Sequence, residues 1–253
     1  MDPHTSLAFD SIGSYYDLLY KDKHYDSEVD YICSLFKRKK FEGSNILELG
    51  CGTGQHARLL ANKGFDILGV EVNPTMLSKV VQSDSFQAVQ GDARNFFTNR
   101  QFDIVLSLFH VLSYQVENSD LDSFFNTASI HLRDGGFFIF DCWFSPAVFH
   151  QGASNRIKRM SDQDFSILRL AEPNSFPSCS VVEVNFTIFV ENLKTGIIQS
   201  FTELHPMRHF SISELDHVAK SHKFERIVSE EFLTGKPLSL ETWGACFVYK
   251  KVN

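Results

Sequence analysis

A glycine-rich turn between an apolar strand and a helix restricts the possible folds of this chain more than any other feature. Residues 46–49 read ILEL and are followed directly by GCGTG at residues 50–54. Glycines let the backbone turn sharply and let a ligand lie against it, and the free N–H groups at a helix start favour an anionic or polar ligand. The junction therefore predicts an α/β domain with a ligand at its first turn, although the glycines alone also fit a dinucleotide site.

Strand-like and helix-like segments alternate on both sides of this turn. Strands are expected near residues 45–49, 65–71, 86–89, 102–108 and 137–140, and helices near residues 13–37, 53–63, 74–81 and 121–132, with a turn at 134–136. Such alternation is typical of a parallel sheet covered by helices on both faces. Apolar strands with little polar alternation support that interpretation, because both faces of such a sheet are buried.

The pattern changes after residue 141. Residues 164–191 and 196–210 look like antiparallel strands, with turns expected at 172–175 and 192–196. A helix at 211–222, with Ser211 or Ser213 as its N-cap, and a final hairpin at 224–232 and 242–251 follow. We therefore expect a doubly wound, mostly parallel seven-stranded sheet with an inserted antiparallel layer. The predicted parts are an N-terminal helical lid at 1–40, a core at 41–151 and 211–253, and the insertion at 152–210.

Composition excludes several classes of function. The 253 residues carry a formal net charge of −7, whereas a protein that tracks phosphates along a nucleic acid needs a basic surface. No apolar run approaches the roughly 20 residues that span a bilayer, and the first ten residues lack a signal-peptide core. The five cysteines are widely spaced without a CxxC pair, which favours reduced thiols in the cytoplasm and no structural metal.

Three carboxylates follow successive strands on one edge of the predicted sheet. Glu48 precedes the glycines, Glu71 ends the second strand, and Asp92 follows the third. A carboxylate after the second strand can accept both ribose hydroxyls, one inside the first strand can face a cation, and one after the third can accept from an adenine amine. The spacing G-x-G-x-G, in place of G-x-G-x-x-G, argues against a nicotinamide cofactor.

Together these segments resemble the class I S-adenosylmethionine-dependent methyltransferases. The matching pieces are ILELGCGTG at 46–54, GVEVNPTML at 69–77, QGDAR at 90–94 and FDIVLSLF at 102–109. The resemblance implies S-adenosylmethionine as the cofactor, with Glu71 on its ribose and Asp92 on its adenine. It implies a binding site formed by Tyr16, Glu48, Gly50, Cys51, Gly52, Gly54, Glu71, Val72, Met76, Gly91, Asp92, Ala93 and Leu108.

Four further segments are candidates for the acceptor site: residues 15–20 (YYDLLY), 109–114 (FHVLSY), 141–146 (DCWFSP) and 203–210 (ELHPMRHF). In a strand Glu203 and His205 share one face. These segments resemble the nucleotide-linked amino-sugar N,N-dimethyltransferases, which implies a nucleotide-sugar acceptor and a homodimer. The implied catalytic residues are Tyr16, His110, Tyr114 and His205, and the implied acceptor-binding residues are Tyr20, Tyr25, Trp143, Glu203 and Arg208. His is common in that family where Tyr114 aligns, which leaves the base open.

The sequence thus predicts methyl transfer to a small polar acceptor, foremost the amine of a nucleotide-linked sugar. O-methylation of a sugar hydroxyl and N-methylation of another small amine are the alternatives within the same chemistry. A short basic run, Arg156, Lys158 and Arg159, is a candidate for contact with a diphosphate. The alternative in a different class is a module that binds S-adenosylmethionine without catalysis.

Overall fold

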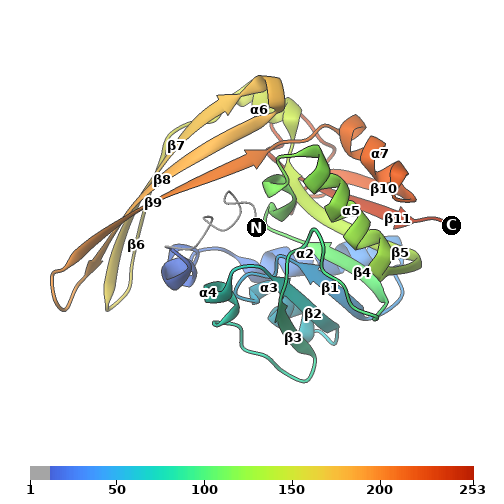
Figure 1. Cartoon of the computed structure of the whole chain (residues 1–253), viewed down its shortest axis with the longest axis horizontal. Helices are drawn as coiled ribbons and strands as arrows, with labels where there is room; N and C mark the ends of the chain where they lie inside the picture. The colour runs from blue at the N-terminus through green and yellow to red at the C-terminus, as the bar shows by residue number, and fades with distance from the viewer. Residues whose placement is uncertain (1–11) are drawn as a thin grey trace.

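The computed structural model describes residues 12–253, so the first residues of the predicted lid lie outside the described part. A seven-stranded sheet has the order β10-β11-β5-β4-β1-β2-β3 (Figure 1). Its strands are β1 Asn45–Leu49, β2 Asp66–Glu71, β3 Phe86–Gln90, β4 Phe102–Ser107, β5 Leu132–Trp143, β10 Phe224–Glu231 and β11 Gly244–Lys251. All neighbours pair in parallel except β11, which is antiparallel to β5 and β10. The predicted fold class is confirmed.

Helices cover both faces of this sheet, as the apolar strands require. On one face α2 (Tyr25–Lys39) and α3 (Gln55–Ala61) contribute Val29, Ile32, Ala57 and Leu60 to a buried cluster with β1 and β4. On the other face α5 (Asn118–His131) and α7 (Ile212–Ser221) pack against Phe138 and Phe140 of β5. Within residues 12–253 no helix is long and apolar enough to cross a membrane.

Four antiparallel strands form a second sheet, which extends away from the core in Figure 1. They are β6 Arg156–Ser161, β7 Phe165–Phe176, β8 Val181–Asn192 and β9 Ile198–Arg208. The short helix α6 (Ser145–Gln151) leads from β5 into this sheet, and β9 leads back through an isolated bridge between Phe144 and Phe210. The chain therefore both enters and leaves the second sheet near the carboxyl end of β5.

The turn that we predicted at residues 172–175 is wrong. β7 continues through Pro173 to Phe176, and the chain reverses at the 3-10 turn Pro177–Cys179. Pro173 pairs with Val184 of β8, whereas the pairing with β6 stops at Ala171. Proline cannot donate a backbone hydrogen bond, but at this position no strand lies on the β6 side to receive one, so the strand tolerates it.

Several other boundaries differ from the predicted ones. The segment 13–37 is not one helix: the 3-10 turn Gly13–Tyr15 and α1 (Tyr16–Leu19) are separated from α2 by a turn. The predicted helices at 53–63 and 74–81 shorten to α3 and to α4 (Pro74–Leu77). The predicted turn at 134–136 is wrong because it lies inside β5, where Gly135 has φ +80° and a register shift accommodates it. The capped helix α7 and the final hairpin agree with prediction, with Ser211 as the N-cap.

The N-terminal segment lies between the two sheets. Ile12 and Leu19 are fully buried against Ile167, Ile188 and Val190 of the second sheet. Asp22 forms an ion pair with Lys158 of β6 at 2.6 Å. Because residues 12–22 contact the second sheet in this way, they close one side of the space between the two sheets.

Candidate active site

The turn after β1 forms a cradle of exposed backbone. Gly50, Gly52 and Gly54 all have positive φ, at +76°, +58° and +78°. A Cβ at Gly50 would lie 2.6 Å from Val111, so the close approach of the loop after β4 requires glycine here. A Cβ at Gly52 would lie 3.1 Å from the Cε atom of Met76, on the side of the cavity. The turn therefore needs glycine both for its backbone angles and for the close approach of its neighbours.

Glu71, at the end of β2, is tied to the cradle. Its Oε2 accepts from the Gly52 N–H and its Oε1 from the Asn73 N–H, both at 2.8 Å. A carboxylate has about four lone-pair positions, so Glu71 can still accept from a ligand hydroxyl. Burial raises the pKa of Glu71, while these backbone hydrogen bonds oppose the rise.

Asp92 follows β3 and is held by Arg94. The guanidinium donates to both carboxylate oxygens, through Nε to Oδ1 and through Nη2 to Oδ2, and also pairs with Asp120 of α5 at 3.2 Å. Burial alone would raise the pKa of Asp92, but the hydrogen bonds and charge of Arg94 together lower it. Asp92 is therefore a fixed anion at the rim of the cavity, and Arg94 adds a cation beside it.

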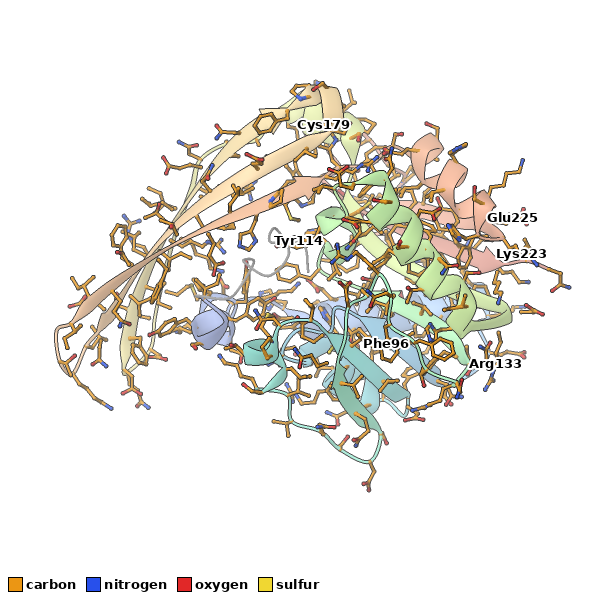
Figure 2. All side chains as sticks on the ribbon, in the orientation of Figure 1. Phe96, Tyr114, Arg133, Cys179, Lys223 and Glu225 are labelled. Carbon is orange, nitrogen blue, oxygen red and sulfur yellow. The ribbon has the colours of Figure 1, made fainter. Side chains whose placement is uncertain are left out.

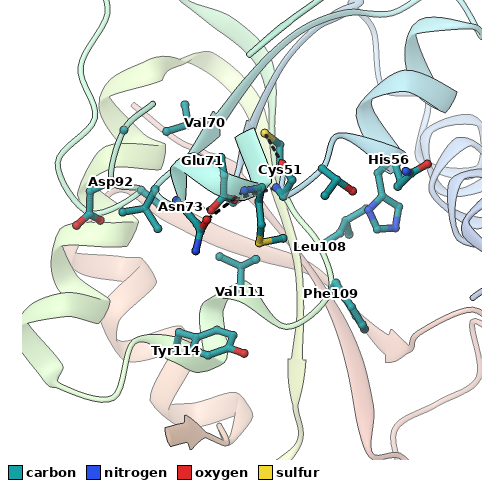
Figure 3. A pocket seen from close by; sticks show the side chains of 18 of the residues that line it. Cys51, His56, Val70, Glu71, Asn73, Asp92, Leu108, Phe109, Val111 and Tyr114 are labelled. Atoms are coloured by element: carbon teal, nitrogen blue, oxygen red, sulfur yellow. Dashed lines mark hydrogen bonds between the residues drawn. The ribbon is translucent and has the colours of Figure 1, made fainter. Parts of the chain in front are cut away.

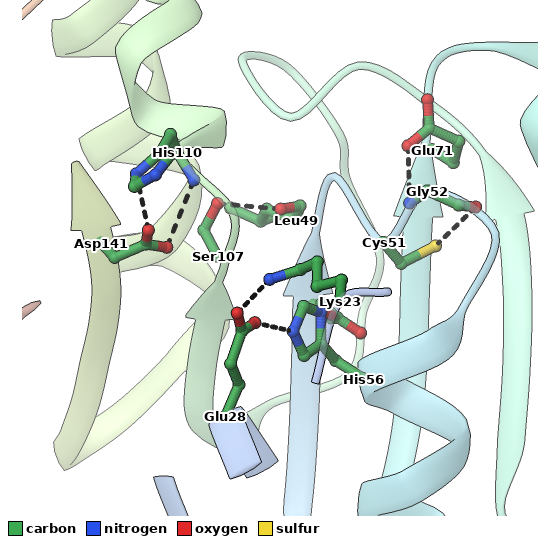
Figure 4. Close-up of polar contacts among 11 residues, drawn as sticks. Lys23, Glu28, Leu49, Cys51, Gly52, His56, Glu71, Ser107, His110 and Asp141 are labelled. Carbon is green, nitrogen blue, oxygen red and sulfur yellow. Dashed lines mark hydrogen bonds and ion pairs between the residues drawn. The ribbon is translucent and has the colours of Figure 1, made fainter. Parts of the chain in front are cut away.

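A buried chain of polar groups lies beneath the cradle (Figure 4). His56 of α3 contacts Glu28 of α2 through Nε2 at 2.6 Å, and its Nδ1 lies 3.9 Å from Glu48 of β1. Lys23 donates to the other oxygen of Glu28, and its ammonium lies 4.1 Å from the centre of the Phe109 ring. Burial and the nearby Glu71 carboxylate raise the pKa of Glu48 to about 8. The chain links the N-terminal helices to the cradle.

One cavity opens over the cradle (Figure 3). Its walls come from the ends of β1, β2, β3 and β4, which is where ligands of open α/β sheets bind. Of the predicted cofactor residues, Tyr16, Gly50, Cys51, Gly52, Glu71, Val72, Met76, Gly91, Asp92, Ala93 and Leu108 line it. The structure adds Tyr25, Thr53, Gln55, His56, Val70, Asn73, Arg94, Phe109, Val111, Tyr114 and Gln115.

A second cavity lies between the core and the four-stranded sheet. Its lining includes Tyr20, His110, Trp143, Arg156, Arg169 and His205. Phe109 and Tyr114, from the loop after β4, line both cavities, and Figure 2 places Tyr114 between the core and the second sheet. A molecule in the first cavity and a molecule in the second would therefore meet across these two rings.

Each of two histidines of the second cavity contacts a buried carboxylate. Nδ1 of His110 lies 2.7 Å from Asp141 at the end of β5. Burial alone would raise the pKa of Asp141, but the charge and hydrogen bond of His110 lower it. On the opposite wall, Nε2 of His205 lies 2.9 Å from Glu203, and Nδ1 of His205 lies 2.8 Å from the hydroxyl of Tyr114. Both pairs have the arrangement that orients an imidazole for proton transfer.

The structure places the remaining predicted residues as follows. Tyr25 lies at the first cavity, with its ring 5.0 Å from that of His56. Glu48 and Gly54 lie behind the cradle, outside the set of described residues that line the cavity. Arg208 lines neither cavity, because its guanidinium donates to Val116, Asn118 and Glu214 and thereby ties β9 to α7. Of the basic run, Arg156 lines the second cavity, Lys158 pairs with Asp22, and Arg159 is exposed.

Sequence reasoning missed Glu28, His56 and Arg169. Glu28 lies beside Val29 on the apolar face of α2, and its burial at 8 % exposure is the kind of anomaly that points to a partner. His56 follows the last glycine of the turn by two residues, and this position at the start of the helix could have indicated a place near the ligand. Arg169 lies in a β-strand without a motif, and only its stacking over Tyr20 and Phe186 in the folded chain distinguishes it.

The glycine cradle, the acidic strand ends and the sheet order together define an S-adenosylmethionine-dependent methyltransferase. Residues 46–136 match the family model described as a methyltransferase domain. The predicted activity, a methyltransferase that uses S-adenosylmethionine, is confirmed, and the chain is similar to the nucleotide-linked amino-sugar N,N-dimethyltransferases.

One relative is the dTDP-3-amino-3,4,6-trideoxy-alpha-D-glucopyranose N,N-dimethyltransferase of Streptomyces venezuelae, 28% identical over 177 residues that span 68% of this chain and 74% of the relative. The fold is shared with a sugar N-methyltransferase from Streptoalloteichus, with a TM-score of 0.80, 21% identity and coverage of 94% of this chain and 93% of that one. It is also shared with an amino pentose methyltransferase from Micromonospora echinaspora, solved with S-adenosylmethionine bound, with a TM-score of 0.75, 20% identity and coverage of 96% and 98%.

Proposed function

We propose that the enzyme methylates the amine of a nucleotide-linked amino sugar, and that the two cavities hold the donor and the acceptor. The observation that supports this most is the common wall of Phe109 and Tyr114 between them. Methyl transfer is an in-line displacement, so the protein must mainly align two bound molecules. Two cavities that meet across one pair of side chains suit that task.

The first cavity fits S-adenosylmethionine in this proposal. Glu71 accepts from the ribose hydroxyls, and Asp92 accepts from the adenine amine. Val72, Met76, Ala93 and Leu108 enclose the adenine, while Gly50, Gly52 and the start of α3 hold the methionine part with Glu48, Cys51 and Tyr16 nearby. When bound, the cofactor supplies a methyl group on a positively charged sulfonium, which the aromatic ring of Tyr16 and the carboxylates favour electrostatically.

The second cavity favours an anionic acceptor molecule. Arg156 and Arg169 line it, and no Asp or Glu occurs among the described residues of its lining. Guanidinium groups bind phosphates through paired hydrogen bonds, and Tyr20 and Trp143 provide flat apolar surface for a ring. These features support a diphosphate-linked sugar over a free amine, in line with what the S. venezuelae relative is named for.

Isotope-labelled S-adenosylmethionine offered with a panel of acceptors tests the proposal. The panel holds TDP-, UDP-, GDP- and CDP-linked amino sugars, their hydroxyl counterparts, and the free amino sugars, each read by mass. We expect a mass gain on a nucleotide-linked amino sugar and none on the free one. A gain on the hydroxyl counterpart would replace N-methylation with O-methylation, and transfer to none of them, with cofactor binding shown by calorimetry, would refute the acceptor class.

A homodimer in the cytoplasm belongs to the same proposal. The outer part of the second sheet carries exposed apolar side chains, among them Ile157, Phe189 and Ile198, and an exposed apolar area of this kind is a candidate interface. All five cysteines are free thiols, which suits a reducing compartment. Light scattering of the purified chain gives the mass that distinguishes a dimer from a monomer.

A further inference from the structure

Tyr114, His205 and Glu203 form a continuous hydrogen-bonded chain from the common wall of the two cavities into the second sheet. The Tyr114 hydroxyl lies 2.8 Å from Nδ1 of His205, and Nε2 of His205 lies 2.9 Å from Oε2 of Glu203. Oε1 of Glu203 accepts the backbone N–H of Ile12 at 3.0 Å. The chain thus joins three separate parts of the protein: the loop after β4, strand β9 and the N-terminal segment.

When His205 is neutral, the donors and acceptors in this chain have one direction. An ionised carboxylate can only accept, so Nε2 of His205 carries the hydrogen that points to Glu203. In a neutral imidazole Nδ1 is then an acceptor, and the Tyr114 hydroxyl donates to it. Tyr114 lines both cavities, so its hydroxyl lies where an acceptor amine in the second cavity would meet the donor in the first.

We propose that Tyr114, His205 and Glu203 are a proton relay that deprotonates the acceptor amine, and that the N-terminal segment completes it through Ile12. The relay rests on the proposed function, since an amine must be the acceptor. An ammonium R–NH₃⁺ gives one proton to the Tyr114 oxygen while the phenol proton passes to Nδ1 of His205. The products are R–NH₂, which has the lone pair for attack on the methyl group, neutral Tyr114, and a His205 imidazolium paired with Glu203.

The surroundings of the relay favour this direction of proton flow. Glu203 and His205 are 6 % and 2 % exposed, so their interaction is screened little by water. Burial raises the pKa of Tyr114 well above its usual range, with Tyr20 and Glu203 adding to the rise and Arg169 opposing it. The phenol therefore passes protons without remaining ionised. Tyr16 and Tyr20 of the N-terminal segment, Arg169 of β7 and Glu203 of β9 act on Tyr114 electrostatically, and His110 and Arg156 line the same cavity.

Glu203 acts as a positioning residue in this scheme, and its contacts with Ile12 and His205 give it a specific sensitivity. The Ile12 N–H and the His205 Nε2–H are both donors to its carboxylate. A glutamine has one acceptor oxygen and one donor nitrogen, so Glu203→Gln can satisfy only one of them. The variant also lacks the negative charge that stabilises the imidazolium.

Steady-state kinetics with dTDP-3-amino-3,6-dideoxyglucose as the probe test the relay. We expect Tyr114→Phe to lower kcat about 100-fold, the scale of lost acid–base assistance, and Glu203→Gln to lower it about tenfold, with little change in cofactor affinity. The pH at which kcat rises should move to lower values in Glu203→Gln, because a neutral side chain no longer stabilises the imidazolium. Glu172→Gln, at an exposed position on β7, is the matched control. Wild-type kcat in both relay variants, or equal losses of kcat and cofactor affinity, would overturn the relay.

The role of Ile12 is tested by a backbone substitution. Ile12→Pro removes the N–H that Glu203 accepts, whereas Ile12→Val keeps it and retains most of the buried side chain. We expect kcat of Ile12→Pro to be about tenfold below that of Ile12→Val, the scale of one hydrogen bond to a charged group. Equal kcat values in the two variants would remove the N-terminal segment from the relay.

A measurement without turnover separates failure of the relay from failure of the proposed function. Nitrogen NMR of ¹⁵N-histidine-labelled protein, with the His205 signals assigned through their loss in His205→Gln, reports which ring nitrogen carries the hydrogen. The relay requires a hydrogen on Nε2 and a bare Nδ1 in the resting enzyme near neutral pH. A hydrogen on Nδ1 refutes the relay whatever the acceptor is, whereas the required tautomer in a protein that leaves the amino sugar unmethylated refutes only the acceptor.

Discussion

Oε2 of Glu28 lies 2.6 Å from Nε2 of His56, across the interface between α2 and α3. Both groups are buried, and α3 starts at the glycine cradle. The contact therefore couples the N-terminal helices to the backbone that surrounds the first cavity. We expect the contact to contribute strongly to the free energy of unfolding, because a buried charge that loses its partner is costly.

Glu28→Gln should lower the free energy of unfolding at pH 7 by about 3 kcal/mol, the scale for breaking a buried pair. Burial alone would raise the pKa of Glu28, but His56 and Lys23 together lower it below the usual 4.5. A depressed carboxyl pKa contributes stability above 4.5 and loses it as the pH falls through the folded value. The difference between wild type and variant should thus shrink below pH 4.5. Urea denaturation followed by circular dichroism measures the free energy of unfolding, and Glu42→Gln, at an exposed position, is the control. Equal effects of the two substitutions would contradict a stabilising role of the Glu28 contact.

Glu48 should have the opposite pH dependence. Its pKa is raised to about 8 by burial and by Glu71, so the folded state holds a proton that the unfolded chain has lost. Stability from this group is complete at acidic pH and declines as the pH rises toward 8. Glu48→Gln, which resembles the protonated side chain, should flatten thermal stability between pH 6 and pH 8, about the range in which wild type declines. Parallel curves for the two proteins would argue against a buried neutral Glu48.

Glu71→Ala should weaken S-adenosylmethionine binding by about 1–3 kcal/mol, the scale for a lost charge-assisted acceptor. The side chain also holds the Gly52 N–H, so part of the loss comes from a looser cradle. Titration calorimetry measures the affinity. Asp66→Asn, at the opposite end of the same strand and paired with Arg100 on the surface, is the control. Unchanged affinity in Glu71→Ala would remove the ribose role.

Arg169→Met should raise KM for a nucleotide-linked amino sugar about tenfold or more, since hydrogen bonds to charged groups are worth about 1.5–3 kcal/mol. Cofactor affinity should not change, because Arg169 lines only the second cavity. Arg159→Met removes a neighbouring charge that is exposed on β6 and serves as the control. Equal KM values for Arg169→Met and Arg159→Met would show that Arg169 does not recognise the nucleotide part.

The sequence alone predicted the seven-stranded sheet and the donor site well, because residues close together in the chain determine both. The strand-glycine-helix junction at Gly50, the acids Glu71 and Asp92 at strand ends, and the Ser211 cap all follow from residues close together in the chain. The expected turn at Pro173 failed for the complementary reason. Proline ends a strand only where its missing N–H is needed, and that depends on the length of the neighbouring β6.

The acceptor side depended on contacts between distant residues. The sequence placed Glu203 and His205 on one face of a strand, but their alignment with Tyr114 into one hydrogen-bonded chain arises because β9 contacts the loop after β4. Tyr16 and Tyr20, four residues apart, line different cavities because the N-terminal segment runs between the two sheets. Glu28 and Arg169 belong to no motif, and only the packing of α2 on α3 and of the N-terminal segment on β7 gives them partners. Short-range periodicity and glycine spacing thus determined the sheet and the donor site, whereas the acceptor site was decided by tertiary packing, because its walls come from segments that no local pattern connects.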